Sequence, residues 1–297
     1  MQDSVLLTTG LPIALAIIMF GLGLALTTQD FVRVARWPKA ALLALACQLF
    51  ILPAVCFGLV VLFDLPATLA VGMMLLAAAP GGTTANLFSF LAGGDVALNV
   101  TLTAINTVLA VVTIPVVVNL SALYFAGESS DLRLPPGEVI PIVAIVLVPI
   151  AIGMIVRSRF HDFAERMQRP VKIGSALVLA LVVIAALVDQ WDVFTENVLR
   201  LGSLSLILCT AMLAVGYYVP RLAKVSYRQS IASAMEVGVQ NATLAITVAL
   251  SLMQQFEVGV SPAIYGVMMF LPATVLAYVM SKRQQTETTP DVAATGS

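Results

Sequence analysis

Nine long apolar runs dominate the chain, and each is long enough to cross a membrane as a helix. We expect these spans at 5–27, 40–63, 67–92, 96–122, 138–156, 170–188, 198–220, 229–254 and 259–281. A bilayer core about 30 Å thick takes about 20 apolar helical residues. Only 10% of the 297 residues are charged and 60% are hydrophobic, which leaves too few polar side chains to cover a water-soluble fold. The sequence therefore predicts an all-α polytopic membrane protein.

The charged residues are too few and too evenly balanced for several other classes of protein. Fifteen basic residues stand against sixteen acidic ones, so no basic surface is available for a nucleic acid. No polar stretch could form a catalytic domain, and the spans lack a nucleophile–base pair or a metal-binding motif. Cys47, Cys56 and Cys209 lie in apolar runs without metal-ligand spacing. We expect a protein that is not an enzyme and that has no nucleic-acid partner and no obligate protein partner.

Basic residues mark one side of the expected spans. Thirteen of the fifteen follow odd-numbered spans, and only Arg133 and Arg200 lie on the opposite side. The positive-inside rule then places the C-terminus in the cytoplasm, and an odd number of spans places the N-terminus outside. We expect one transmembrane domain at 1–281, followed by a disordered cytoplasmic tail at 282–297.

Two spans are interrupted at corresponding positions. Each is the next-to-last span of its half, if the chain divides into four spans and five. The interruptions are Pro80-Gly81-Gly82-Thr83-Thr84-Ala85-Asn86 and Glu236-Val237-Gly238-Val239-Gln240-Asn241. Lipid cannot satisfy the backbone groups that such breaks leave free, so these segments must line a cavity in the protein. Paired broken helices are typical of inverted-repeat secondary transporters. We expect repeats at about 5–122 and 138–281, the first lacking one helix.

Glu236 is the only acidic residue well inside a span, and no Lys or Arg lies at a similar depth. A charge at the bilayer centre costs about 3 kcal/mol on insertion scales, so a bound cation is the expected counter-charge. At about 1.5 Å per residue, Gln48, Asn86 and Thr103 lie at the same depth as Glu236. These carboxylate, amide and hydroxyl oxygens suit sodium better than zinc or copper. A lone Gln or Thr is also a common hydrogen-bonding contact between helices.

The chain resembles the bile acid:sodium symporter family over about residues 10–281. The resemblance rests on Phe20-Gly21-Leu22-Gly23-Leu24, Gln48 with Pro53, the segment from Pro80 to Asn86 continuing to Gly94-Asp95, and the segment from Glu236 to Asn241. It implies a panel domain, a core domain in which the two broken helices cross, and two sodium sites behind the crossing. The chain is similar to bacterial members with nine helices, which would be multi-pass proteins of the inner membrane.

The resemblance also implies roles for individual residues. The first sodium site would comprise Asn86, Thr103 and Glu236, with Ala85 and Asn99 where the family usually has serines. Ala85 could offer only its backbone carbonyl, whereas Asn99 could offer an amide oxygen. The second site would comprise the side chains of Gln48, Glu236 and Gln240 and the carbonyls of Val237 and Val239. Thr83 and Asn241 match substrate contacts, and an asparagine that some members have in the ninth span has no clear counterpart.

The expected function is sodium-coupled symport. The protein would import an organic anion, either bile-acid-like or a small carboxylate, by alternating access. The alternative is a carrier or exporter of organic anions with the same fold that does not depend on sodium and is driven by the substrate gradient or by protons through Glu236.

Overall fold

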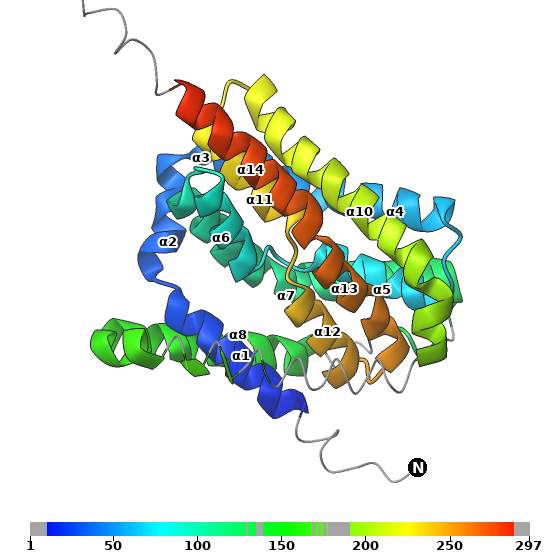
Figure 1. Ribbon diagram of the computed structural model, residues 1–297. Coiled ribbons are helices and arrows are strands. Elements are labelled where there is room, and N and C mark those ends of the chain that lie inside the picture. The colour runs from blue at the N-terminus through cyan, green and yellow to red at the C-terminus, as the bar shows by residue number, and fades with distance from the viewer. Residues whose placement is uncertain are drawn as a thin grey trace, which may run out of the picture.

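The fold is a bundle of helices, as Figure 1 shows. The computed structural model describes residues 11–128, 130–134, 139–167 and 191–287, with a few isolated positions between 170 and 177. The regular elements in these ranges are all helices, which confirms the predicted all-α class. They are α1 (Leu11–Ala25), α2 (Thr28–Val32), η2 (Arg33–Arg36), α3 (Pro38–Ala46), η3 (Cys47–Ile51), α4 (Leu52–Leu62), α5 (Ala67–Ala78), α6 (Thr83–Leu91), α7 (Val96–Ala126), α8 (Val139–Arg159), α10 (Trp191–Leu222), α11 (Tyr227–Gly238), α12 (Ala242–Ser251), α13 (Phe256–Met268) and α14 (Phe270–Glu287).

Within the described residues, four continuous helical stretches are long and apolar enough to cross a membrane. They are Pro38–Leu62, Val96–Ala126, Trp191–Leu222 and Phe256–Arg283, and they coincide with the second, fourth, seventh and ninth expected spans. Helices α1 and α8 coincide with the first and fifth spans. The sixth expected span, 170–188, lies for the most part outside the described residues. These stretches support an integral membrane protein.

The third and eighth expected spans are each split into two helices, but over shorter segments than the sequence suggested. Only Ala79–Gly82 separates α5 from α6, and only Val239–Asn241 separates α11 from α12. Asn86 and Glu236 therefore lie within helices. The last helix is longer than expected, because α14 continues to Glu287 instead of ending near residue 281. The good helix formers Lys282 and Arg283 extend it into the expected tail, whose remainder lies outside the described residues.

The two interruptions pair with each other. Gly81 and Gln240 form an isolated antiparallel bridge. The backbone N–H of Gly82 donates to the carbonyl of Val239 at 3.3 Å, and that of Asn241 donates to the carbonyl of Pro80 at 2.9 Å. Each break thus supplies the hydrogen-bond partners that the other lacks, which is how nonhelical backbone survives at membrane depth. In Figure 1 both extended connections lie near the middle of the molecule.

Helices α1 and α8 form a pair set apart from most of the other helices (Figure 1). Their backbones approach closely at two glycines. A Cβ atom on Gly23 would lie 2.2 Å from the carbonyl oxygen of Ile150, and one on Gly153 would lie 2.5 Å from that of Phe20. Small residues allow such close helix packing in membranes. The pair contacts the remaining helices mainly through α7 and α12, as a panel packed on a core would.

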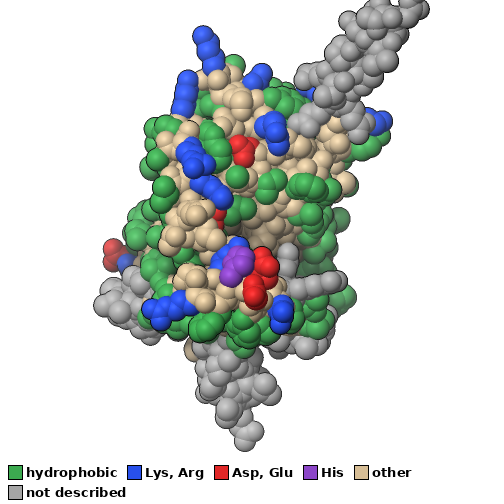
Figure 2. All heavy atoms as spheres, turned by 90° about the vertical axis from the view of Figure 1, so that its left-hand side faces the viewer, with side chains coloured by type: hydrophobic (Ala, Val, Ile, Leu, Met, Phe, Trp, Pro, Cys, Tyr) green, Lys and Arg blue, Asp and Glu red, His purple; other side chains and the backbone are tan. Residues whose placement is uncertain are grey.

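Many Lys and Arg side chains gather on one end of the molecule, the face that Figure 2 shows. This end carries η2, the beginning of α3 and the C-terminal end of α8, with basic residues at Arg36, Lys39 and Arg159. Arg200 lies near the other end, where its guanidinium donates to the backbone carbonyl of Asp64. These four residues lie at the ends where the expected spans would place them.

Candidate functional site

Glu236 lies in the last turn of α11 with no exposed surface. Thr103 donates its hydroxyl to Oε2 at 2.6 Å, and Asn106 donates its amide Nδ2 to Oε1 at 2.8 Å. Asn99 Nδ2 lies 3.3 Å from Oε2, and the backbone of Gly81 contributes a further hydrogen bond. No Lys or Arg in the described part of the chain forms an ion pair with this carboxylate. A buried negative charge with only neutral donors around it favours a bound cation.

Gly81 approaches the Glu236 carboxylate so closely that any side chain at this position would displace the carboxylate. A Cβ atom at this position would lie 2.4 Å from both Cδ and Oε2 of Glu236. The glycine brings the first interruption into contact with the acid in the last turn of α11. A residue without a side chain at this position lets the carboxylate keep its place.

Helix α7 supplies three of the groups that surround Glu236. Asn99, Thr103 and Asn106 are spaced four and three residues apart, so they share one face of the helix. Asp95 caps the N-terminus of α7 by accepting a hydrogen bond from the backbone N–H of Leu98 at 3.1 Å. The sequence reasoning identified Asn99 and Thr103 but missed Asn106. Its helical spacing from the other two was the signal that could have found it.

The Asn99 amide presents its nitrogen to Glu236. The same nitrogen donates to the carbonyl of Ala232 at 2.9 Å, and because both partners are oxygens, the amide oxygen must face elsewhere. The side-chain oxygens of Asn86, Asn99 and Asn106 are all buried without a hydrogen-bond partner. Buried polar atoms in proteins are normally paired, so these three amide oxygens are available as hard ligands for a cation.

Gln48 and Gln240 form a second cluster next to the interruptions. Gln48 lies in η3, a π-helical turn, and such turns are frequent at functional sites. Its Nε2 donates to the Ala79 carbonyl at 2.8 Å and to Gln240 Oε1 at 3.0 Å. Gln240 Nε2 donates to the Val237 carbonyl at 2.6 Å and lies 3.3 Å from Gln48 Oε1. The two side chains thus link η3 and α11 with both breaks.

Most of the expected site residues fall into two hydrogen-bonded groups, one around Glu236 and one around Gln48 and Gln240. The others join neither group. Asn99 and Thr103 contact Glu236, while Gln48, Gln240 and Val237 contact one another. The carbonyl of Val239 accepts from the first interruption. Asn86 has no recorded hydrogen bond to any of these within the described residues, and its neighbour Ala85 is fully buried. Gln48 and Thr103 thus belong to separate hydrogen-bonded clusters.

Two helix N-termini meet at the crossing. Thr83 is the exposed first residue of α6. Asn241 caps α12, and its Oδ1 accepts from the backbone N–H of Leu244 at 3.0 Å. Helix N-termini carry a partial positive charge, whereas the C-termini of α5 and α11, which end at the same crossing, carry a partial negative charge. The crossing can therefore attract an anion on one side and a cation on the other.

Comparison with known proteins identifies close relatives. Residues 12–197 match the sodium bile acid symporter family. The chain is 35% identical over 276 residues to an uncharacterised sodium-dependent transporter, YocS, of Bacillus subtilis, covering 91% of this chain and 83% of that protein. It is 28% identical over 251 residues to the human ileal sodium/bile acid cotransporter, covering 82% and 70%. A probable chloroplastic sodium/metabolite cotransporter of Oryza sativa is 27% identical over 271 residues, covering 91% and 64%.

Proposed function

The chain belongs to the sodium bile acid symporter family, and from this premise we propose that it is a secondary symporter that imports an organic anion together with sodium. Membership of this family confirms the expectations that the protein is a membrane transporter and that it is not an enzyme. The names of its relatives describe sodium-dependent transport in three kingdoms of organism.

The observation that carries the proposal is the Glu236 carboxylate at the junction of the two broken helices. It is fully buried, has no basic ion-pair partner in the described residues, and accepts from Asn99 and Asn106, whose amide oxygens are themselves buried and unpaired. Sodium would supply the missing positive charge. We assign the ion to oxygens around Glu236 and around the Gln48–Gln240 pair, in two positions that share the carboxylate. The proposed ligands are Asn86, Asn99, Thr103, Glu236, Gln48 and Gln240, with the carbonyls of Ala85, Val237 and Val239.

The substrate would bind at the other side of the crossing, where the N-termini of α6 and α12 attract negative charge. Thr83 and Asn241 would contact it. A bile-acid-like compound or a small carboxylate fits this chemistry, and the relatives are named for bile acids and metabolites. Sodium bound to Glu236 would hold the two breaks together, so binding of the ion and of the anion would strengthen each other.

Transport would follow from movement of the α1–α8 pair relative to the other helices, which would open the crossing to each side of the membrane in turn. We place the protein in a bacterial inner membrane with its C-terminus in the cytoplasm, since the basic end of the molecule would then face inside. The inward sodium gradient would drive uptake.

One observation favours the sodium-independent alternative. Four neutral donors already surround Glu236, and a carboxylate offers about four lone-pair positions. The acid could therefore remain buried without a cation. The two functions differ in one measurable property, the response of the protein to sodium.

Transport and binding assays with two site variants test the proposal. Purified protein would be screened by thermal shift against organic anions with sodium or choline as the cation, because a ligand of the native state raises the unfolding temperature. The best anion would then be used for uptake into proteoliposomes. We expect Glu236→Gln and Gln240→Ala each to reduce sodium-stimulated uptake at least about tenfold, a loss of about 1.4 kcal/mol in coupling.

The matched control is Glu257→Gln. Glu257 lies in the first turn of α13 and accepts a hydrogen bond from Thr68 at 2.6 Å, away from the crossing. This variant should keep its sodium dependence. Uptake by the Glu236 or Gln240 variant that is still stimulated by sodium would contradict the proposal, and wild-type uptake indifferent to sodium would favour the alternative.

A further inference from the structure

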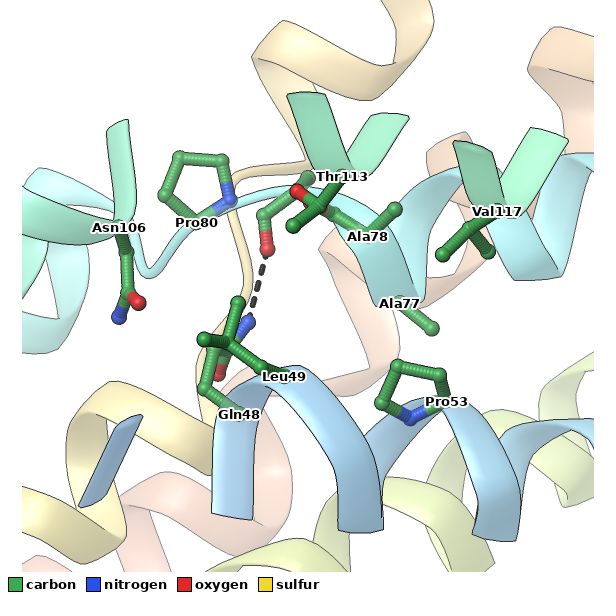
Figure 3. A pocket seen from close by; sticks show the side chains of 10 residues that line it. Gln48, Leu49, Pro53, Ala77, Ala78, Pro80, Asn106, Thr113 and Val117 are labelled. Atoms are coloured by element: carbon green, nitrogen blue, oxygen red, sulfur yellow. Dashed lines mark hydrogen bonds between the residues drawn. The ribbon is translucent and has the colours of Figure 1, made fainter. Parts of the chain in front are cut away.

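A small pocket lies behind the crossing, between the turn that carries Gln48 and helix α7. Figure 3 shows it from close by. Its lining includes Gln48, Pro80, Asn106, Thr113 and Val117. It has room for about one water-sized particle. This size excludes an organic anion and leaves a water molecule or a small ion as the occupant.

Asn106 connects this pocket to Glu236. Its Nδ2 donates to the Glu236 carboxylate at 2.8 Å, which leaves Oδ1 on the other side of the amide. That oxygen is buried and unpaired, and the residue is only 3% exposed. In Figure 3 the oxygen of Asn106 lies on the side of the pocket. Because donation to a carboxylate polarises an amide, the free oxygen becomes a stronger acceptor.

The other polar side chains of the pocket have no hydrogen left to donate into it. Thr113 donates its hydroxyl to the Ala78 carbonyl at 3.2 Å. Gln48 uses its two amide hydrogens on Ala79 O and Gln240 Oε1. The carbonyls of Ala78 and Ala79 lie at the C-terminal end of α5, which carries a partial negative charge. The polar side chains can therefore only accept, and such a pocket selects a cation over an anion.

We propose that this pocket is a sodium site, in which Asn106 Oδ1 is a ligand and Asn106 Nδ2 couples the bound ion to Glu236. The inference rests on the proposed sodium-coupled function. The ion would lie on the α7 side of Gln48, with Thr113 Oγ1 and the carbonyls at the end of α5 as further oxygens. This position is additional to those assigned from the family resemblance, none of which involves Asn106 or Thr113.

The chemistry of the pocket favours sodium over transition metals and divalent cations. No His, Cys, Asp or Glu lies among its lining residues, so it lacks the ligands that transition metals prefer. It also lacks the carboxylates that a divalent ion would need. Glu236 supplies a formal negative charge on the far side of the Asn106 amide.

Two variants test the site through different atoms. Asn106→Leu removes the ligand oxygen at similar volume, and Val117→Leu fills the far end of the pocket without touching Asn106 or Glu236. The control is Thr101→Val, since Thr101 is buried on the same helix and bonds only to the Ala97 carbonyl of its own helix at 2.8 Å. Each purified protein would be titrated with NaCl at constant ionic strength, with choline chloride as the balance and no organic anion, while its unfolding temperature is followed.

We expect the half-saturating sodium concentration to rise about tenfold in Asn106→Leu and in Val117→Leu, and to stay within about twofold of wild type in Thr101→Val. Sodium titrations of both pocket variants that match wild type would overturn the site and leave a water molecule as its occupant. If Asn106→Leu does not fold, Val117→Leu decides. A wild-type protein that sodium does not stabilise would instead refute the proposed function itself.

Discussion

Glu236 depends on donors from two separate segments, which are the first break with Gly81 and helix α7 with Asn99, Thr103 and Asn106. None of these donors carries a charge. A carboxylate that accepts hydrogen bonds only from neutral groups keeps its negative charge available to bind a cation. A carboxylate paired with Arg or Lys would bind a cation more weakly. The residues around this acid thus decide whether it acts as a structural group or as an ion ligand.

Substitutions at Gly81 and at its neighbour Gly82 should affect transport differently. We expect Gly81→Ala to reduce transport at least about tenfold, because its Cβ would occupy the space 2.4 Å from the Glu236 carboxylate. Gly82→Ala should stay within about twofold of wild type, since its Cβ would lie 3.6 Å from the nearest atoms. Initial uptake rates in proteoliposomes, normalised to folded protein, measure both. Equal losses in the two variants would show that the contact with Glu236 is unimportant.

The broken helices act as a unit. Each break is short, and each closes its backbone hydrogen bonds on the other through Gly82 with Val239 and Asn241 with Pro80. On the opposite side, the carbonyl of Gly238 accepts from Tyr265 at 2.8 Å. The crossing is therefore tied to α13 as well as to α7. In the proposed mechanism it would hold the ion ligands in place while the α1–α8 pair moves.

The close packing of α1 against α8 predicts the effect of a glycine substitution on stability. Gly153→Ala should destabilise the protein by about 1 to 3 kcal/mol, since its Cβ would meet backbone atoms of α1 that cannot rotate away. Gly58→Ala on α4 is the control, because no atom lies within 4 Å of its Cβ position. Thermal unfolding in detergent compares them. An unchanged unfolding temperature for Gly153→Ala would mean that the two helices do not pack as closely as described.

Many Lys and Arg side chains lie on the face of the molecule that Figure 2 shows. This asymmetry orients a membrane protein during insertion because positively charged loops are retained in the cytoplasm. In the proposed function it would also set the direction of transport, since the membrane potential and the sodium gradient would both favour cation entry from the opposite side.

Labelling of introduced cysteines tests this orientation. Arg36 and Asp131 are both exposed, and they lie on opposite sides of the expected spans. We expect Arg36→Cys to react with a membrane-impermeant maleimide only after cells are permeabilised, and Asp131→Cys to react in intact cells. The native Cys47, Cys56 and Cys209 are buried, so the background should be low. The reverse labelling pattern would invert the proposed topology and the direction of uptake.

Much of the architecture could be predicted from the sequence, because hydropathy, charge and helix breaking act over short stretches of chain. The helical class, the spans that match α7 and α10, and the two interruptions follow from such local patterns. The isolation of Glu236 follows as well. The depth of each residue in the membrane can be counted along its helix, and this count places no basic residue at the depth of Glu236. The ends of elements were less predictable: the breaks are shorter than the Pro80–Asn86 and Glu236–Asn241 segments suggested, and α14 runs to Glu287.

Contacts between distant segments required the folded chain. Nothing local in the sequence connects Asn106 with Glu236, 130 positions away, or turns the Asn99 amide so that its nitrogen faces the acid. The pairing of the two breaks and the pocket beside Gln48 depend on how helices pack against one another. Helix packing sets side-chain distances and amide orientations in three dimensions, whereas the sequence specifies only which chemical groups are available for that packing.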